Sequence, residues 1–482
     1  MNPRRVLRIS GLLLLVIAFM TLAPLGIAIA DGVPRAILAY ALGGTLMALT
    51  AWFMLRFGRR SEPVIERRDA FGIVALTWFA LGIFGAIPFL IEGAVERPAE
   101  AFFEAVSGFT TTGATVIGDV EALSRATNLW RCLMHWIGGM GIVVLFVAVF
   151  PHLGIGARQL FMAESPGPLN EGLRPRIKQS ALTLWWIYAA ITGACALVYA
   201  LGGMSTYEAL CHAMSTLATG GFSTRARSIA SFDSPLIEWS TCFFMLAAGL
   251  NFGLYDALLR GRARLAVRDS EARFFLILNV LIILLTFLLT MARHSSVEEA
   301  LRKSTFQILA VTTTTGFSTD DFDTYPDIIR WILFLAMFMG GCTGSTAGGL
   351  KVFRVLVALK VVVKEVRLSV EPAAIMAIRV GTKALPSTIV GAILVFIVSF
   401  LVLFLTATSL LIAFGLDFVS ASSAVVSCMS SVGIGLGRVG PTHDFGFISS
   451  PGLFVLSFIM IAGRLEIFAL LAAFSPAAWR RS

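Results

Sequence analysis

Apolar runs alternate with shorter polar segments along the whole chain. Ten of these runs approach or reach the length of a membrane-spanning helix, which requires about 20 apolar residues. They cover residues 9–30, 36–55, 71–91, 129–150, 180–200, 236–259, 274–291, 328–339, 389–414 and 451–474. The run at 328–339 is too short to cross a membrane alone. The pattern predicts an all-α polytopic membrane protein.

The composition points the same way. Of the 482 residues, 57% are hydrophobic and 14% are charged, which is more apolar surface than a soluble chain can bury. The six cysteines lie mostly in apolar segments without metal-ligand spacing, and the five histidines are dispersed. We therefore expect no cofactor bound by this chain. Since no nucleophile–base or metal constellation is found either, we expect no enzyme.

The first 30 residues are similar to a secretory signal, with Arg4 and Arg5 before an apolar stretch that ends in Ala28-Ile29-Ala30. That stretch is long for the apolar core of a signal, and a second apolar run follows at once. We therefore interpret it as a retained first helix. It would form an N-terminal transmembrane pair over residues 1–60.

Charge alternates in sign from one polar segment to the next. The net charge is +9, with basic clusters such as 260–268 and acidic clusters such as 320–327. An excess of Lys and Arg marks cytoplasmic loops, so we predict a multi-pass protein with both termini in the cytoplasm. Because the basic segments are separated by acidic ones, we expect the lipid membrane and no nucleic acid as a partner.

One module recurs four times. Aligned on Gly113, Gly221, Gly316 and Gly433, its copies are EAFFEAVSGFTTTGATV, EALCHAMSTLATGGFST, KSTFQILAVTTTTGFST and SASSAVVSCMSSVGIGL. Each copy has an apolar run before it, a half-length amphipathic stretch leading to the glycine, and another run after it. The period predicts four pore repeats, the third with a broken second helix, over residues 69–152, 180–260, 271–370 and 386–476.

The half-length stretches are too short to cross a membrane and too apolar for solvated loops. Non-helical backbone at membrane depth is tolerated only where it is buried in protein or lines a water-filled cavity. We therefore predict re-entrant pore helices and filter loops around one central pore. A periplasmic surface loop is the alternative.

The chemistry of these loops suits a cation. Backbone carbonyls can replace an ion's hydration shell, and glycine adds no Cβ to crowd a pore. Helix C-termini aimed at the axis carry about half a negative charge each, so no carboxylate is needed. The residues at and just before the four aligned glycines, 111–113, 219–221, 314–316 and 431–433, include no Asp or Glu.

The four degenerate filters in one chain resemble the Trk/Ktr/HKT superfamily of potassium uptake proteins. The segments GGFST, TTTTGFSTDDF and AGRLEIFALL, with the extra N-terminal pair, are most similar to its bacterial TrkH branch. The resemblance implies that backbone groups coordinate K⁺, the transported ion. It also implies rubidium transport and a position in the bacterial inner membrane. The candidate ion-binding residues are Thr111, Thr112, Gly113, Thr219, Gly220, Gly221, Thr314, Thr315, Gly316, Ser431, Val432 and Gly433.

Two details of these filters stay open. In the second filter, either Gly220 or Gly221 can be the residue that matches Gly113. In the fourth filter, SSVGIGLG, the TrkH branch more often has Asn before the Val and Pro after the first Gly. Ser431 and Ile434 therefore leave the shape of that quadrant undecided.

The segment GGCTGSTAGGLK at 340–351 stops a helix, and helical character resumes after it. It lacks the phosphate-loop pattern, so we interpret it as a mobile gating loop under the filter, with an ordinary cytoplasmic turn as the alternative. Its candidate gate residues are Gly340, Gly341, Thr343, Gly344, Ser345, Thr346, Ala347, Gly348 and Gly349.

Arg464 lies in the last apolar run, where a charged side chain at membrane depth has a high free-energy cost. Such a side chain should face a cavity or a partner. We predict that it contacts carbonyls of the 340–349 loop as a positive barrier. The alternative is a side chain that snorkels to the cytoplasmic edge. Asn251 and Asp256 either line the inner vestibule or cap a helix.

A sodium-coupled or sodium-permeable carrier is the alternative to potassium uptake. Inverted repeats would alternate in orientation, whereas all four modules place their filter on the acidic side. The resemblance further implies a homodimer and a cytosolic nucleotide-binding regulatory ring of the TrkA type.

Overall fold

The computed structural model describes residues 1–59, 67–149, 174–374, 376–381 and 383–475. The expected repeat limits at 60, 150–152 and 476 lie outside these ranges. The described chain is helical apart from one two-stranded hairpin, so the expected all-α class is confirmed. The hairpin, β1 (Arg379–Val380) and β2 (Lys383–Ala384), pairs antiparallel.

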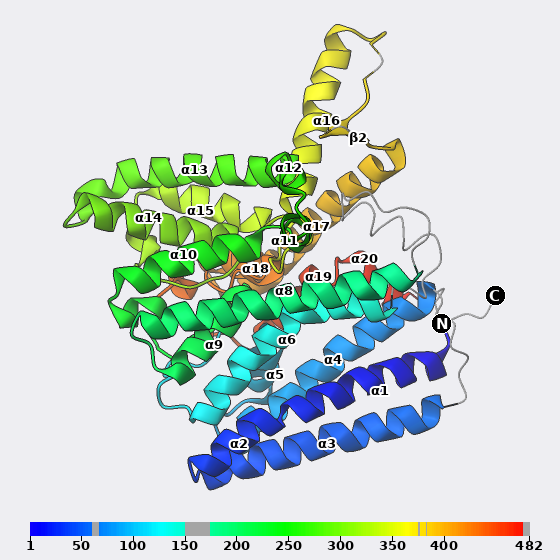
Figure 1. Cartoon of the computed structure of the whole chain (residues 1–482), viewed down its shortest axis with the longest axis vertical. Coiled ribbons are helices and arrows are strands. Elements are labelled where there is room, and N and C mark those ends of the chain that lie inside the picture. Colours follow the sequence, from blue (N-terminus) through cyan, green and yellow to red (C-terminus); the bar gives the residue numbers. More distant parts are fainter. Residues whose placement is uncertain (60–66, 150–173, 375, 382, 476–482) are drawn as a thin grey trace.

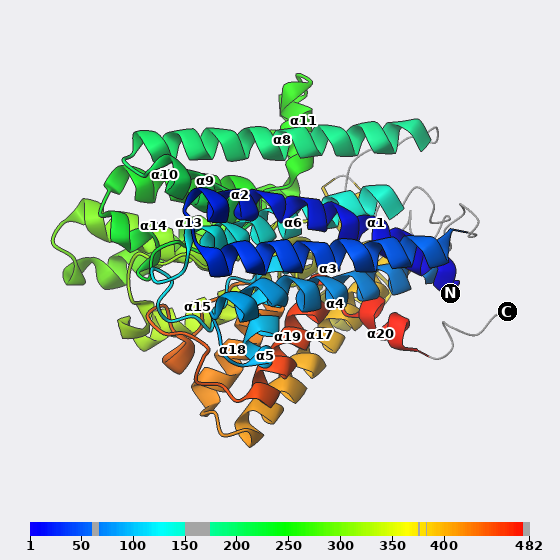
Figure 2. The same cartoon turned by 90° about the horizontal axis from the view of Figure 1, so that it is seen from below.

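Two helical units precede the repeats. The first is α1 (Pro3–Met20) continued by α2 (Leu22–Ala30), and the second is α3 (Pro34–Gly58). Figure 1 shows α1 and α3 side by side along one edge of the bundle, packed onto α4. The buried Arg5 guanidinium lies 2.9 Å from the Asp69 carboxylate of α4 and ties α1 to the first repeat. The start of α1 and α20 lie at the same end of the molecule (Figures 1 and 2).

The four repeats share one order of elements: a long helix, a half-helix and a second helix. The long helices are α4 (Arg67–Glu92), α8 (Arg174–Leu201), α13 (Ser270–Thr290) and α17 (Ser387–Ala413). The half-helices are α5 (Pro98–Phe109), α9 (Thr206–Leu217), α14 (Val297–Thr312) and α18 (Phe418–Ser430).

The second helices start with α6 (Arg125–Val149), α10 (Pro235–Gly249), α15 (Asp327–Met339) and α19 (Ser450–Arg464). After their breaks follow α11 (Phe252–Leu259), α16 (Val352–Val370) and α20 (Phe468–Phe474). The short elements are α12 (Ala263–Val267) and the 3₁₀ turns η2 (Ser228–Phe232), η3 (Met291–Arg293), η4 (Phe322–Thr324) and η5 (Gly437–Val439).

Packing closes these elements into a ring. Each second helix packs against its own half-helix and against the half-helix of the next repeat: α6 joins α5 to α9, α10 joins α9 to α14, and α15 joins α14 to α18. The last one, α19, joins α18 back to α5. The half-helices therefore surround one axis, as expected for four pseudo-repeats. Where each repeat begins and ends stays a prediction.

Two expected spans differ from the structure. The run 236–259 is not one span, because α10 and α11 meet at an angle of 92° after Gly249. The run 451–474 breaks after Arg464, where Glu466 and Ile467 have positive φ. The second helix of the third repeat stops at Met339 and resumes at Val352, as predicted. Three of the four second helices are thus interrupted, where the sequence indicated one.

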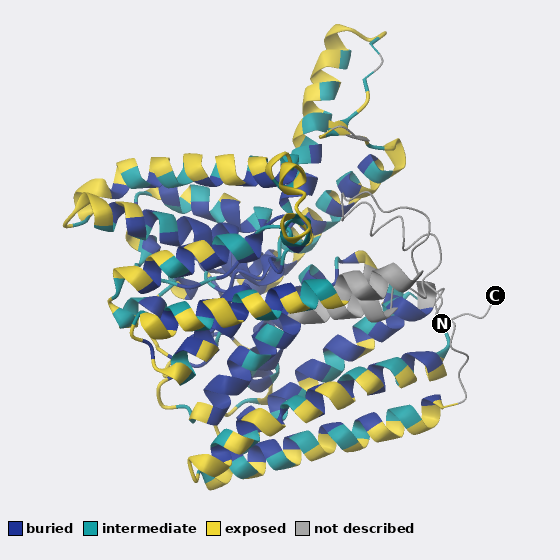
Figure 3. Ribbon diagram, viewed as in Figure 1, coloured by how far each residue is buried: buried dark blue, intermediate teal, exposed yellow. Residues whose placement is uncertain are grey.

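The exposed surface is apolar. Figure 3 shows buried residues concentrated in the centre and exposed ones on the outer faces of helices such as α13. Only 22% of the most apolar window of α13, and of α17, is buried. Within the described residues, six helices are long and apolar enough to span a membrane, or seven if the bent α10–α11 pair counts as one. Such faces fit lipid as the surrounding solvent.

The close contact between α6 and α5 generates a stability prediction. A Cβ added at Gly138 would overlap the carbonyl oxygen of Phe109, which is main chain and does not move aside. We expect Gly138→Ala to cost about 1–3 kcal/mol, and to lower the thermal unfolding midpoint of the detergent-purified protein. Gly391→Ala on α17 is the control, because no heavy atom lies within 4 Å of its added Cβ. Equal midpoints for the two variants would contradict the contact.

Candidate functional site

The four half-helices have polar caps at one end and buried residues at the other. Ser205 and Glu208 form a capping box at α9, Ser296 caps α14, and Asp417 accepts a hydrogen bond from the Ser420 amide at α18. At α5, the Glu100 carboxylate accepts from the Arg97 backbone N–H at 3.0 Å. The opposite ends converge in the interior, so each helix C-terminus points at the axis of the ring.

Each half-helix ends in the same turn, a Schellman motif with Thr or Ser where glycine is usual. The residues in the left-handed position are Thr111, Thr219, Thr314 and Ser431, with φ of 54°, 53°, 57° and 59°. The next residue donates its N–H to the carbonyl five residues back in the bonds Thr112–Ser107, Gly220–Ser215, Thr315–Ala310 and Val432–Ser427, at 2.9, 2.9, 2.9 and 2.8 Å. A β-branched residue in this conformation is strained, and such strain persists only where the surroundings enforce it.

The three residues from each left-handed position onward, 111–113, 219–221, 314–316 and 431–433, are here called the central strings. Their third residues, Gly113, Gly221, Gly316 and Gly433, have φ of 80°, 84°, 74° and 88°. By these φ angles, Gly221 corresponds to the other three glycines and Gly220 to Thr112. Ser431 and Gly433 of the fourth string have φ angles like those of their counterparts, and its turn makes the same hydrogen bond.

The central strings touch one another in a closed cycle. A Cβ added at the glycine of each string would overlap the carbonyl oxygen of the middle residue in the neighbouring string. The glycine–carbonyl pairs are Gly113 with Gly220, Gly221 with Thr315, Gly316 with Val432, and Gly433 with Thr112. The strings therefore meet around one axis, and at these contacts main chain lies against main chain without an intervening side chain.

The loop 340–351 lies against the C-terminal ends of three half-helices. The Thr346 hydroxyl donates to the Leu217 carbonyl at 2.9 Å, and the Gly348 N–H donates to the Thr314 hydroxyl at 2.8 Å. A Cβ at Gly348 would overlap the carbonyl oxygen of Ser430. The loop thus sits directly beside the ring, on the side opposite the caps. Thr343 and Thr346 of the loop are buried, which an ordinary cytoplasmic turn would not require; its role as a gate stays a prediction.

A buried carboxylate holds both ends of this loop. Oε1 of Glu271, on the first turn of α13, accepts the N–H of Thr343 at 2.6 Å and that of Phe353 at 3.1 Å. The loop is also bonded to α10, because the Cys342 N–H donates to the Gly249 carbonyl at 2.9 Å. Sequence analysis missed Glu271, since its partners are backbone groups more than 70 residues away.

Arg464 ends α19 and is 7% exposed. Its guanidinium donates to the Thr346 carbonyl of the loop at 2.9 Å and to the Gly138 carbonyl of α6 at 3.2 Å. Its Nε has no partner among the described residues. The side chain points inward, which contradicts snorkelling to a membrane edge. Glu466 pairs instead with Arg354 of α16, at 2.7 Å.

The other polar candidates have local partners. The Asn251 side chain accepts from the Gly253 N–H at 2.7 Å and caps α11, and Asp256 pairs with Arg260 at 2.8 Å. Capping is therefore seen for Asn251, at the N-terminus of α11, whereas Asp256 is engaged in an ion pair within α11 and caps no helix. All six cysteines are free and buried. Among the described residues, no group of three or more His, Cys, Asp or Glu could hold a metal ion.

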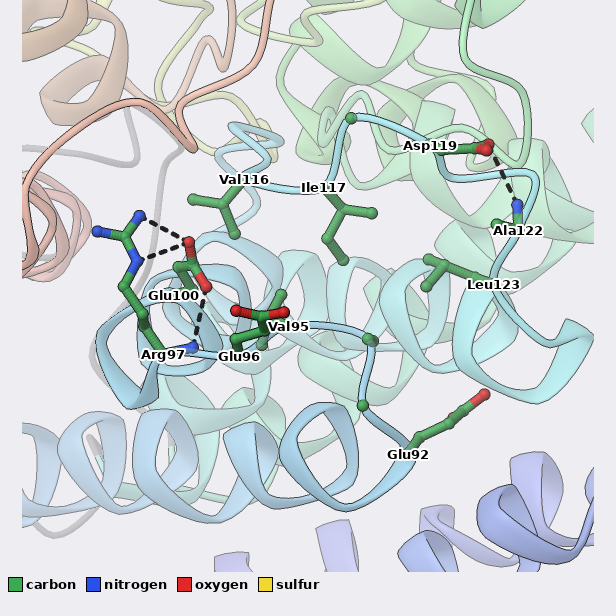
Figure 4. A pocket seen from close by; sticks show the side chains of 13 residues that line it. Glu92, Val95, Glu96, Arg97, Glu100, Val116, Ile117, Asp119, Ala122 and Leu123 are labelled. Atoms are coloured by element: carbon green, nitrogen blue, oxygen red, sulfur yellow. Dashed lines mark hydrogen bonds and ion pairs between the residues drawn. The ribbon is translucent and has the colours of Figure 1, made fainter.

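A pocket of about 470 Å³ opens beside the capped end of α5. Figure 4 shows carboxylates around it, with Glu100 bound to the Arg97 side chain and backbone. Burial would raise the pKa of Glu100, but these hydrogen bonds and the Arg97 charge outweigh it and lower that pKa. The Glu92 carboxylate also accepts a hydrogen bond from the Thr127 hydroxyl, and Asp119 accepts one from the Ala122 N–H, so three of the carboxylates that line the pocket are engaged within the protein.

Sequence reasoning also missed a buried pair behind the ring. Glu104 of α5 and Arg131 of α6 lie 2.9 Å apart and are almost fully buried. The spacing of 27 residues gives no local signal, because α5 and α6 lie side by side only in the folded chain. The one available clue was a charged residue on each of two apolar segments.

Known proteins of one kind match this chain. The family model TrkH, described as a cation transport protein, matches residues 46–481. The Trk system potassium uptake protein TrkH of Halomonas elongata is 40% identical, and that of Escherichia coli K12 is 38% identical. Both alignments cover 100% of each chain.

A solved structure agrees in fold over the full length. The crystal structure of the potassium transporter TrkH from Vibrio parahaemolyticus superposes with a TM-score of 0.91 at 36% identity, covering 100% of both chains. The architecture expected from the sequence resemblance is thus found in a relative of known structure. The chain belongs to the TrkH family of cation transport proteins, a family of membrane transporters and not of enzymes.

Proposed function

We propose that this protein takes up potassium, and also rubidium, across the bacterial inner membrane through the ring of central strings. The closed cycle of glycine–carbonyl contacts carries the proposal, because it places main-chain oxygens from all four repeats around one axis. Four helix C-termini aimed at that axis add a negative potential without a carboxylate. The relatives named as potassium uptake proteins, at 38–40% identity over the full length, support the choice of ion.

The loop 340–351 and Arg464 form the gate in this proposal. The loop covers the inner end of the ring through Thr346 and Gly348, and the Arg464 guanidinium, bonded to the Thr346 carbonyl, places a positive charge there. A cation leaving the ring would meet this charge. Opening requires the loop to leave the Thr314 hydroxyl and Arg464. Glycines at 340, 344 and 349, which already have positive φ, let its backbone change shape.

The orientation and partners follow the sequence expectations. The capped ends of the half-helices face the periplasm, and both termini and the loop side face the cytoplasm. Helix α16 projects from the bundle (Figure 1) and carries Lys360, Lys364 and Arg367. We propose this basic projection as the docking surface for a cytosolic nucleotide-binding ring, which would pull on α16 and thereby on the loop. The transporter would act as a homodimer with one pore in each chain.

Ion flux tests the proposed function. Proteoliposomes should take up rubidium without any organic substrate, and the reversal potential under potassium/sodium gradients should follow potassium. Gly316→Ser should abolish uptake or selectivity, because its Cβ overlaps the Val432 carbonyl. Gly415→Ser is the matched control, since Gly415 has φ of 96° but no atom within 4 Å of an added Cβ. A reversal potential that follows sodium would favour the sodium-permeable alternative.

The register of the second string can be tested by rescue. A Cβ at Gly220 would overlap the His135 ring, whereas one at Gly221 would overlap the Thr315 main chain. We expect Gly220→Ala to lose rubidium uptake and to regain part of it when combined with His135→Ala. Gly221→Ala should not be rescued by the same second change. Rescue of both variants, or of neither, would speak against the assigned register.

Arg464 generates a gating prediction. Hydrogen bonds to charged groups contribute about 1.5–3 kcal/mol, so Arg464→Ala should destabilise the closed state and raise the open probability of the unactivated channel roughly tenfold or more. Arg464→Lys should fall between, because an ammonium cannot reach the Thr346 and Gly138 carbonyls as a planar guanidinium does. Single-channel recording measures both variants. Unchanged open probability and uptake in Arg464→Ala would remove this role.

A further inference from the structure

Each half-helix carries a buried polar side chain that bonds to the chain just beyond its own central string. In the first three repeats this residue stands nine positions before the string's glycine, as Glu104, His212 and Gln307. The fourth repeat has Ala424 at that position, and the neighbouring Ser423 makes the bond. All four polar side chains are 0% exposed or close to it. We call these four residues the clamps.

The clamp of the first repeat is an ion pair. Glu104 accepts the Val116 N–H at 3.1 Å and the Thr115 hydroxyl at 3.0 Å, and the Arg131 Nε donates to it at 2.9 Å. Arg131 also donates to the Ser223 carbonyl of the second repeat at 3.2 Å. Because an isolated charge at this depth would be very costly, each member of the pair needs the other. The outer ends of two strings are therefore fixed together.

The second clamp is a neutral histidine. Nδ1 of His212 bonds the Glu208 carbonyl at 2.8 Å, so Nδ1 carries the proton and Nε2 accepts from the Ser223 hydroxyl at 2.9 Å. Ser223 is thereby held on two sides, by its hydroxyl in its own repeat and by its carbonyl from Arg131. The residue lies two positions after Gly221.

The third and fourth clamps are uncharged. Nε2 of Gln307 donates to the Asp320 carbonyl at 3.1 Å and to the Thr319 hydroxyl at 3.3 Å. The Ser423 hydroxyl exchanges bonds with both the N–H and the carbonyl of Leu436, each at 3.0 Å. The two repeats thus reach the same anchoring with an amide and a hydroxyl.

We propose that Glu104, His212, Gln307 and Ser423 are positioning residues that set the preference of the ring for potassium over sodium. The inference rests on the proposed function and adds the residues that fix the spacing of the carbonyl oxygens in the ring. A string has two ends: the Schellman turn fixes the inner one, and the clamp fixes the outer one, two to four residues beyond the glycine. With both ends held, the carbonyls keep the spacing that suits the larger ion. With one end released, they can close around the smaller one.

The test compares substitutions that leave the strings themselves unchanged. Gln307→Glu keeps the side-chain shape but faces the Asp320 carbonyl with an acceptor in place of a donor. Ser423→Ala removes one hydroxyl. Ser457→Ala is the matched control, because Ser457 is a fully buried hydroxyl in the same repeat that bonds only within α19, to Leu453 at 2.8 Å.

Reversal potentials in proteoliposomes under potassium/sodium gradients give the readout. We expect the sodium-to-potassium permeability ratio to rise about three- to tenfold in Gln307→Glu and in Ser423→Ala, the size expected for a lost buried hydrogen bond. Ser457→Ala should match the wild type. Thermal unfolding midpoints of all variants are measured alongside, so that loss of stability is not mistaken for loss of selectivity.

Each outcome decides the proposal. Folded Gln307→Glu and Ser423→Ala proteins with wild-type reversal potentials would overturn it, and so would an equal shift in Ser457→Ala. If Gln307→Glu does not fold, Ser423→Ala decides by itself. A wild type that carries no potassium current would overturn the proposed function and this inference together, whereas a selective wild type with unchanged variants would overturn the clamps alone.

Discussion

Every peptide group at membrane depth has to find a hydrogen-bond partner inside the protein, and this constraint shapes the centre of the molecule. Four helices stop there, and each would leave its last carbonyls and the following N–H groups without partners. The Schellman turn satisfies the N–H groups, because the next two of them donate back to carbonyls of the helix. The carbonyl oxygens of the four middle residues then lie against the glycines of the neighbouring strings, in a closed cycle.

The residue that opens each string has a side chain although its backbone is left-handed. A left-handed residue is normally glycine, yet here it is Thr111, Thr219, Thr314 or Ser431. In the third string the side chain gives the loop 340–351 a partner, since the Thr314 hydroxyl accepts the Gly348 N–H. The hydroxyls of Thr111 and Ser431 have no partner among the described residues. At the glycines themselves no side chain fits, because the neighbouring string's carbonyl occupies that space. The strain at one residue and the bare backbone at the other thus serve two sides of one ring.

The sequence predicted the elements whose cause is local. The alternation of apolar runs gave the helices, and the repeated Ser/Thr-Gly segments gave the half-helices, their order and their common centre. Gly340 and Gly341 correctly marked the break between α15 and α16, in the third repeat. The bend after Gly249 and the break at Glu466 were missed, because neither run contains a glycine-rich segment like 340–349 and their interruption depends on tertiary contacts. One of these is the Phe252 N–H bonded to the Gly344 carbonyl. The contacts of Glu104 and Glu271 were missed for the same reason.

Charge is distributed in a way that favours passage over tight binding. The central strings contain no carboxylate, so in the proposed function a cation meets only the partial charges of helix ends and carbonyls, and conduction requires that an ion leave as readily as it enters. Two buried carboxylates near the ring are paired with cations: Glu104 with Arg131, and Glu238 with Arg302 and Lys303 at 2.6 and 2.8 Å. These pairs can hold the repeats together without acting as a trap for the ion. The exception is Arg464, whose neighbours in the described structure are carbonyls and not a carboxylate. In the proposed function this uncompensated positive charge, bonded to the loop 340–351 through the Thr346 carbonyl, is suited to act as a barrier to a cation.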